Sequence, residues 1–166
     1  TFMDAYEEQE GPAIEHVRRF GNESFSGVSF SENGLTHRVV IQGHNPKRIT
    51  ADADIHTDAH VTAVETDGSA ISRWMVEGGS RLSVGEQKLL RANTSCSVAV
   101  NSDTDAAPAR IQVACDEPAR VRIHLPEEPS NLLMSPVDSP DNGRQITPEY
   151  VAGKLRVELE SAGEYV

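Results

Sequence analysis

Acidic and imidazole side chains occupy every second position in one segment of the chain: Asp52, Asp54, His56, Asp58 and His60. In one straight β-strand, alternate residues point to the same side, so all five side chains would share a face. Imidazole together with carboxylate suits Zn²⁺, and carboxylates alone suit Ca²⁺. The spacing therefore predicts a metal site whose ligands are Asp54, His56, Asp58 and His60. It differs from the helical HExxH site, because no Glu follows His56.

A second interpretation of the same segment needs no metal. If Ile49–Asp52 and Val61–Glu65 are separate strands, the residues between them form a polar connection, and their acids and histidines face solvent. On this interpretation the chain holds no cofactor. A structural Zn²⁺ or Ca²⁺ is the alternative.

Three further residues are candidates for binding a ligand: His44, Arg73 and Trp74. His44 lies in the turn sequence GHNP, ahead of Lys47. Trp74 is the only Trp, and in ISRWMV the alternation places it on the face opposite Arg73. A Trp can stack on a sugar ring, but it is also a common core or interface anchor. Both roles stay open from the sequence.

Catalytic motifs are not found in the chain. It contains no GxSxG nucleophile elbow, phosphate-binding loop or GxGxxG fingerprint. Acidic residues lie in almost every turn, so no carboxylate pair can be assigned to glycosidic chemistry. We expect no catalytic residue in this chain.

The two cysteines predict a strand register. Cys96 lies in TSCSVAV and Cys115 in IQVAC, with a turn expected at 103–108. Pairing the strands about that turn places Val100 opposite Ile111, and Cys96 directly opposite Cys115. Two interpretations follow, either free core thiols or a disulfide, and the disulfide would indicate an exported protein.

Short alternating segments between turn signals dominate the rest of the chain. The turn signals include Asp67-Gly68, Gly78-Gly79 and Gly85. The pattern predicts an all-β protein, an antiparallel β-sandwich of about ten to twelve short strands. The expected strands are Ile14–Phe20, Phe25–Phe30, Thr36–Gln42, Ile49–Asp52, Val61–Glu65, Ile71–Val76, Arg81–Val84, Lys88–Arg91, Ser95–Val100, Arg110–Ala114, Arg120–Leu125 and Lys154–Leu159.

A proline-rich segment at 126–148 interrupts this pattern. Proline cannot donate to a β-ladder, so the segment is expected to be a long loop rather than a central strand. We expect residues 1–166 to form one β-sandwich module that carries this loop. The opening Thr1 and the strand-like ending Gly163–Val166 suggest a fragment of a larger protein.

Charge narrows the classes of partner. The net charge of −11 repels a phosphate backbone and an anionic lipid surface, so nucleic acid is not an expected partner. No apolar run approaches the roughly 20 residues that span a bilayer, so membrane insertion is not expected.

Several phrases resemble a known family. ITADADIHTDAHVTAVETDG, RWMVEGGSRLSVGEQKLLRA and the opening TFMDAYEEQEGPAIEHVRRF are similar to the β-rich C-terminal region of heparinase II/III-like polysaccharide lyases. In that family an α/α toroid precedes the β-sandwich, and the catalytic Tyr and His come largely from upstream. The resemblance covers roughly residues 1–125, and it carries over no catalytic residue.

The resemblance implies a noncatalytic accessory or structural β-sandwich of a polysaccharide-processing enzyme, with a lyase as the parent. Its partners would be other domains of the parent chain and a polysaccharide, and its location would be secreted or at the cell surface. The alternatives are an independent carbohydrate-binding module, or a structural or adhesive surface domain.

Overall fold

A computed structural model describes residues 14–101, 110–125 and 148–165. The protein is all-β, as predicted, and these residues form thirteen antiparallel strands. Apart from Pro148, the proline-rich segment lies outside the described residues. The strands are β1 (Ile14–Asn22), β2 (Phe25–Glu32), β3 (Leu35–Gln42), β4 (Ile49–Ala51), β5 (Ile55–Thr57), β6 (Val61–Asp67), β7 (Ala70–Val84), β8 (Gln87–Asn101), β9 (Arg110–Cys115), β10 (Ala119–His124), β11 (Glu149–Val151), β12 (Lys154–Leu159) and β13 (Gly163–Tyr165).

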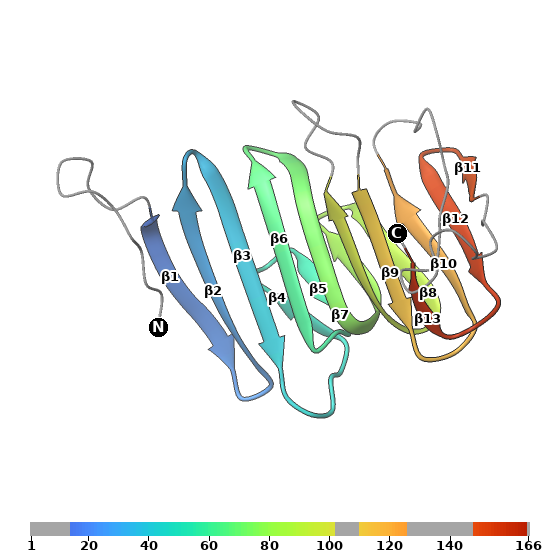
Figure 1. The fold of residues 1–166 in the computed structure, drawn as a ribbon. Helices are drawn as coiled ribbons and strands as arrows, with labels where there is room; N and C mark the ends of the chain where they lie inside the picture. The colour runs from blue at the N-terminus through green and yellow to red at the C-terminus, as the bar shows by residue number, and fades with distance from the viewer. Residues whose placement is uncertain (1–13, 102–109, 126–147, 166) are drawn as a thin grey trace.

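Two strands, β7 and β8, run through both layers of the sandwich. The first half of β7 pairs with β6 and its end with β5, whereas the start of β8 pairs with β10 and its end with β9. The first sheet therefore contains β1, β2, β3, β6, the first half of β7, the second half of β8, β9 and β13. The second sheet contains β4, β5, the second half of β7, the first half of β8, β10, β12 and β11. Figure 1 shows β4 and β5 lying behind β3 and β6.

The bend in β7 lies at Gly78 and Gly79, where the pairing with β8 shifts register. Gly78 has a φ of 64°, and a Cβ there would lie 2.6 Å from the ring of His60. A Cβ on Gly79 would lie 2.6 Å from the Cβ of Ala59. Only glycine leaves room for the segment before β6 to cross so closely.

The expectation of a turn at Gly78-Gly79 was therefore wrong. The flanking segments stay paired with β8, so the two glycines bend a single strand and do not end it. The expected strands at 71–76 and 81–84 are both parts of β7, and those at 88–91 and 95–100 are both parts of β8. The short strands β5 and β11 were not expected, whereas β13 lies in the strand-like ending Gly163–Val166.

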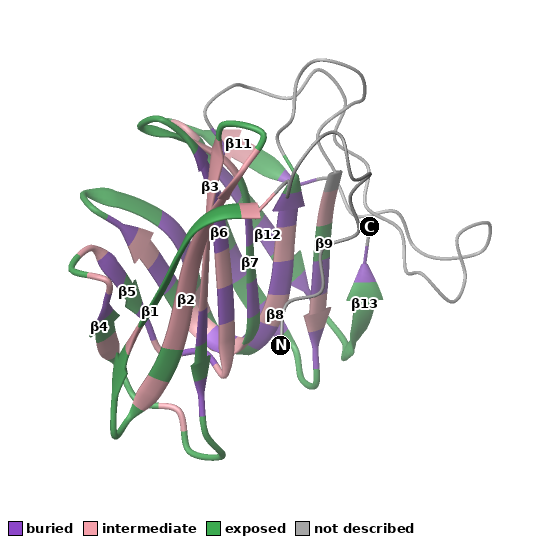
Figure 2. Ribbon diagram, turned by 90° about the vertical axis from the view of Figure 1, so that its left-hand side faces the viewer, coloured by how far each residue is buried: buried purple, intermediate pink, exposed green. Residues whose placement is uncertain are grey.

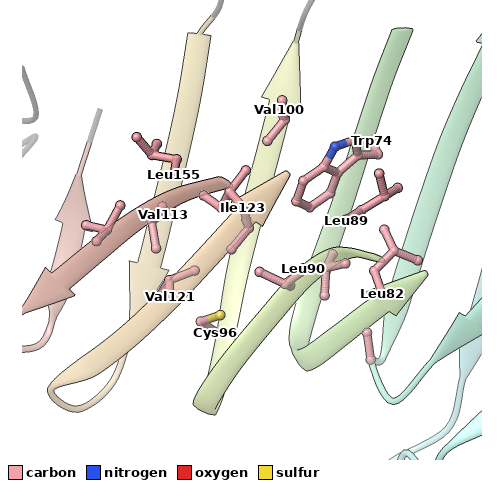
Figure 3. Close-up of a cluster of buried hydrophobic side chains, with 14 of the residues drawn as sticks. Trp74, Leu82, Leu89, Leu90, Cys96, Val100, Val113, Val121, Ile123 and Leu155 are labelled. Carbon is pink, nitrogen blue, oxygen red and sulfur yellow. The ribbon is translucent and has the colours of Figure 1, made fainter. Parts of the chain in front are cut away.

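Buried side chains of both sheets meet in one core. Along β10 and β12 buried and exposed residues alternate, as expected for strands with one face on a core. Figure 3 shows Trp74 and Val100 of the first sheet with Leu82, Ile123 and Leu155 of the second. Each such side chain contributes about 1.5–3 kcal/mol by leaving water. Figure 2 shows how mostly exposed β1 contrasts with the buried bands of the central strands.

The predicted register of the cysteine strands is confirmed. Val100 pairs with Ile111, Val98 with Val113, and Cys96 with Cys115. Both cysteines are buried and carry free thiols.

Candidate functional site

The four predicted metal ligands do not converge in the structure. Asp54 forms an ion pair with Arg38 at 2.6 Å, and the Nδ1 atom of His56 lies 2.9 Å from the Thr50 hydroxyl. The Nδ1 atom of His60 lies 3.1 Å from the carbonyl oxygen of Gly43. Within the described residues, no group of three or more potential ligands is close enough to hold a metal.

Asp58, the fourth predicted ligand, holds the corner of β7. Its Oδ1 accepts backbone N–H groups of Ser80 at 2.8 Å and Arg81 at 2.9 Å. Its Oδ2 accepts the Ser80 hydroxyl at 2.6 Å. The carboxylate therefore satisfies donors that the bend in β7 would otherwise leave without partners.

Backbone geometry explains why this segment is not one straight strand. Asp52 and Ala53 have φ values of 47° and 67°, which close the tight turn between β4 and β5. Within residues 52–60 only Ile55–Thr57 is a strand, β5, and the residues on either side connect it to β4 and β6. Asp52 does face another element, because it forms an ion pair with Arg18 of β1.

The three predicted ligand-binding residues lie apart. Trp74 is 4% exposed and belongs to the core, so its ring faces the second sheet rather than solvent. Arg73 is exposed on the opposite face of β7 and lies 3.6 Å from the carboxylate of Glu65. His44 is exposed in the β3–β4 connection. Arg73 pairs with Glu65, and Glu65 pairs with His37 near the start of β3, whereas His44 follows the end of β3. His44 and Arg73 therefore share no surface site.

A basic groove lies on the outer face of the second sheet, with a volume of about 460 Å³. None of the described residues that line it is acidic. Six lining residues are Lys or Arg and two are His: Arg48, Arg81, Lys88, Arg91, Arg122, Lys154, His56 and His124. In a chain whose net charge is −11, this gathering of cations is a local reversal of the overall charge.

A row of four arginines crosses the outer face of the second sheet, and three of them, Arg81, Arg91 and Arg122, line the groove. Arg81 of β7 pairs with Arg91 of β8, Arg91 pairs with Arg122 of β10, and Arg122 pairs with Arg156 of β12. Their neighbours along each strand, such as Val121 and Ile123 on β10, are buried in the core. Strand alternation therefore turns all four arginines to the outside. We call these four residues the arginine row.

Like charges placed directly opposite one another destabilise a sheet. At the edge, Arg156 is paired with Glu149 at 3.3 Å. The other three arginines form no ion pair with any described residue. Adjacent strands lie about 4.8 Å apart, so the backbone positions that carry these three arginines fall within a span of about 10 Å.

A second cationic row runs beside the first. His124 of β10 pairs with Lys154 of β12, and Ser83 of β7 pairs with Lys88 of β8. His56 of β5 extends this row, because it pairs with Ser83. On the other side of the arginine row, Arg120 is matched by Glu158 at 3.3 Å, so the unpaired charge stops there.

This arrangement is suited to binding an anionic group. Guanidinium groups bind carboxylate and sulfate oxygens through two parallel hydrogen bonds, and ammonium groups add point charges. The described lining residues include no carboxylate that could act as a base. His56 pairs with Ser83, and its Nδ1 lies within hydrogen-bond distance of the Thr50 hydroxyl.

A second cavity, of about 580 Å³, lies between the sheets near the β4–β5 turn. Its charged lining residues are Arg18, Arg38, Asp52 and Asp54. These form two ion pairs, Arg18 with Asp52 and Arg38 with Asp54. The cavity thus has little charge left to offer a ligand, unlike the basic groove.

No family model matches the chain, and no curated protein matches it. Among the described residues there is also no helix long and apolar enough to cross a membrane.

Proposed function

We propose that this chain is a noncatalytic β-sandwich module of a polysaccharide-processing enzyme, and that it holds an acidic polysaccharide in the basic groove. The observation that carries the proposal is the arginine row, three members of which have no acidic partner in the described protein. Groups that cost stability and have no partner within the protein are suited to a ligand from outside. The resemblance to the C-terminal β region of polysaccharide lyases supports the same class of ligand.

The charge distribution favours a polyuronate or a sulfated glycan over nucleic acid. Double-stranded DNA carries one charge per roughly 1.7 Å of its axis, and most of this protein's surface would repel it. An acidic polysaccharide carries its charges one or a few per sugar, so the groove can bind a short stretch of it. None of the described residues that line the groove is Phe, Tyr or Trp, which argues against a neutral glycan held by ring stacking.

Binding measurements on a panel of polymers test the proposal. The isolated chain is titrated at low salt with a polyuronate, a sulfated glycosaminoglycan, a neutral glucan and double-stranded DNA. We expect binding to at least one of the two acidic polysaccharides, weakening as NaCl is raised from 50 to 300 mM, because salt screens exposed charges. We expect no binding to the glucan, and weaker binding to DNA than to the acidic polysaccharides.

Arg91→Glu is the decisive variant, because Arg91 lies between Arg81 and Arg122. The loss of charge-assisted hydrogen bonds worth about 3 kcal/mol lowers affinity about a hundredfold. Arg19→Glu is the matched control: it makes the same change in net charge on exposed β1, where Arg19 has no ion pair with a described residue. Equal losses in both variants would mean that overall charge, and not the groove, binds the polymer.

The alternatives give different results in the same experiment. An independent carbohydrate-binding module would bind a neutral glycan and tolerate Arg91→Glu. A structural or adhesive domain would bind none of the polysaccharides. Release of unsaturated sugars from a polyuronate by this chain alone would contradict a noncatalytic role.

A further inference from the structure

The two cysteines lie where the chain crosses between the sheets. Cys96 follows the bend of β8 and pairs in the first sheet, whereas residues 90–92 of β8 pair in the second. Cys115 ends β9 in the first sheet, and the chain then crosses to β10 in the second. The two cysteines therefore lie where β8, and the connection from β9 to β10, pass from one sheet to the other.

Register and orientation bring the two side chains together. Cys96 and Cys115 are direct cross-strand partners, and both are buried, at 3% and 7% exposure. Direct partners in antiparallel strands have Cα atoms about 4.5–5.5 Å apart, inside the range that disulfides span. Formation of a bond between them requires no change of register.

The surroundings of the two thiols leave a route for a reagent. Both cysteines line a cavity of about 400 Å³ together with Ser97, Asp116 and Gly163. Each thiol donates a weak hydrogen bond to a carbonyl oxygen, Cys96 to Gly79 at 3.5 Å and Cys115 to Ser161 at 3.8 Å. Neither bond is strong enough to hold a thiol away from its neighbour.

We propose that Cys96 and Cys115 are a site of reversible disulfide formation by exchange with a small-molecule disulfide. The Cys115 thiolate, which belongs to the more exposed cysteine, attacks one sulfur of the reagent and releases one small thiol. Cys96 then loses its proton and attacks Cys115 Sγ, which releases the second small thiol. The protein loses two electrons and two protons, and one reagent disulfide becomes two thiols.

The expected pH dependence follows from burial. Burial and the neighbouring Cys115 raise the pKa of the Cys96 thiol to about 12, and burial also raises the pKa of Cys115. The thiolate is the reactive form. As long as the pH is below the pKa, each unit by which the pH is raised increases the thiolate population about tenfold. Exchange is therefore slow at neutral pH and speeds up between pH 7 and 9, so the thiols persist until an oxidant is supplied.

Incubation of the folded chain with oxidised glutathione tests the site. Intact mass should show the loss of two hydrogens, and peptide mapping should show a link between Cys96 and Cys115. The closed loop of about twenty residues restricts the unfolded chain, so we expect the oxidised protein to melt about 5–10 °C higher. Its circular dichroism should be unchanged.

Single variants separate exchange within the pair from modification of one cysteine. In Cys96→Ser the mixed disulfide on Cys115 has no resolving thiol, so one glutathione should remain attached. In the unsubstituted chain the mixed disulfide should not accumulate, because Cys96 resolves it. Two free thiols after prolonged incubation at pH 9 would overturn the proposal, as would a stable glutathione adduct on the unsubstituted chain or an oxidised form that melts lower than the reduced one.

Discussion

The hairpin β7–β8 contributes to both sheets, yet the outer faces of the two sheets carry different kinds of side chain along it. On the first sheet five successive cross-strand partners are apolar, Val28, Val39, Ala63, Met75 and Ala99, and the row ends at Arg19 on β1 and Gln112 on β9. On the second sheet the corresponding row is Arg81, Arg91, Arg122 and Arg156. The apolar row stabilises its sheet through side-chain contact, at about 0.2–1 kcal/mol for each pair. Because like charges opposite one another destabilise a sheet, we expect the arginine row to cost its sheet stability.

Charged residues on the first sheet show that this chain does pair charges where they meet. Glu65 lies 3.5 Å from His37 and 3.6 Å from Arg73. The ring of His37 also stacks on Phe30, with centroids 4.8 Å apart. In contrast to this network, Arg81, Arg91 and Arg122 at the centre of the arginine row form no ion pair with a described residue.

Trp74→Ala is the largest test of this contrast. Trp74 fills the core beneath the first sheet, and its truncation leaves a cavity that costs about 3–5 kcal/mol. Denaturant unfolding measures the loss. Binding of the acidic polysaccharide, measured where the variant is still folded, should stay within about twofold, because the ring does not reach the groove. A tenfold loss of affinity in a folded variant would make Trp74 a ligand contact after all.

Asp58→Ala removes the carboxylate that holds the corner of β7. Two backbone N–H groups and the Ser80 hydroxyl lose their acceptor, so we expect a loss of about 2 kcal/mol in unfolding free energy. Arg81 is also released, so affinity for the acidic polysaccharide should fall severalfold. Asp58→Asn retains an acceptor oxygen, so it should lose less unfolding free energy and less affinity than Asp58→Ala.

The same variant distinguishes a structural carboxylate from a metal ligand. We expect EDTA, Zn²⁺ and Ca²⁺ to leave the melting temperature of the unsubstituted chain unchanged. A drop in melting temperature with EDTA that disappears in Asp58→Ala would restore the metal site predicted from the alternation of residues 52–60.

Local pattern was enough to predict most of the strands, because alternation and turn residues act over a few positions. It also predicted the Cys96–Cys115 register, since the two strands form a hairpin and a hairpin fixes its own register. It failed at Gly78-Gly79, which has the composition of a turn. Pairing on both sides of the glycines continues the strand, and that pairing is a long-range property.

The basic groove could not be predicted for the same reason. Arg120, Arg122 and His124 alternate visibly in the sequence, as do Lys154 and Arg156. Alternation says that such residues share a face, but not which strands are neighbours. Arg91 and Arg122 are brought together only because β10 pairs with β8 across an intervening strand and a change of sheet.

Arg91→Thr is the smallest and sharpest test of the comparison between the two faces. It removes the repulsion of Arg91 with Arg81 and Arg122 and places a residue favoured in strands at an exposed position. We expect a gain of about 0.5–1 kcal/mol in unfolding free energy at low salt, together with weaker binding of the acidic polysaccharide. The gain should shrink in 1 M NaCl, where the Debye length falls to about 3 Å. Met75→Thr is the matched control on the apolar row, and it should give no gain at either salt concentration and leave binding intact. If Arg91→Thr were destabilising at low salt, the stems of the arginines would be packing partners rather than a cost, and the main argument for a ligand in the groove would fail.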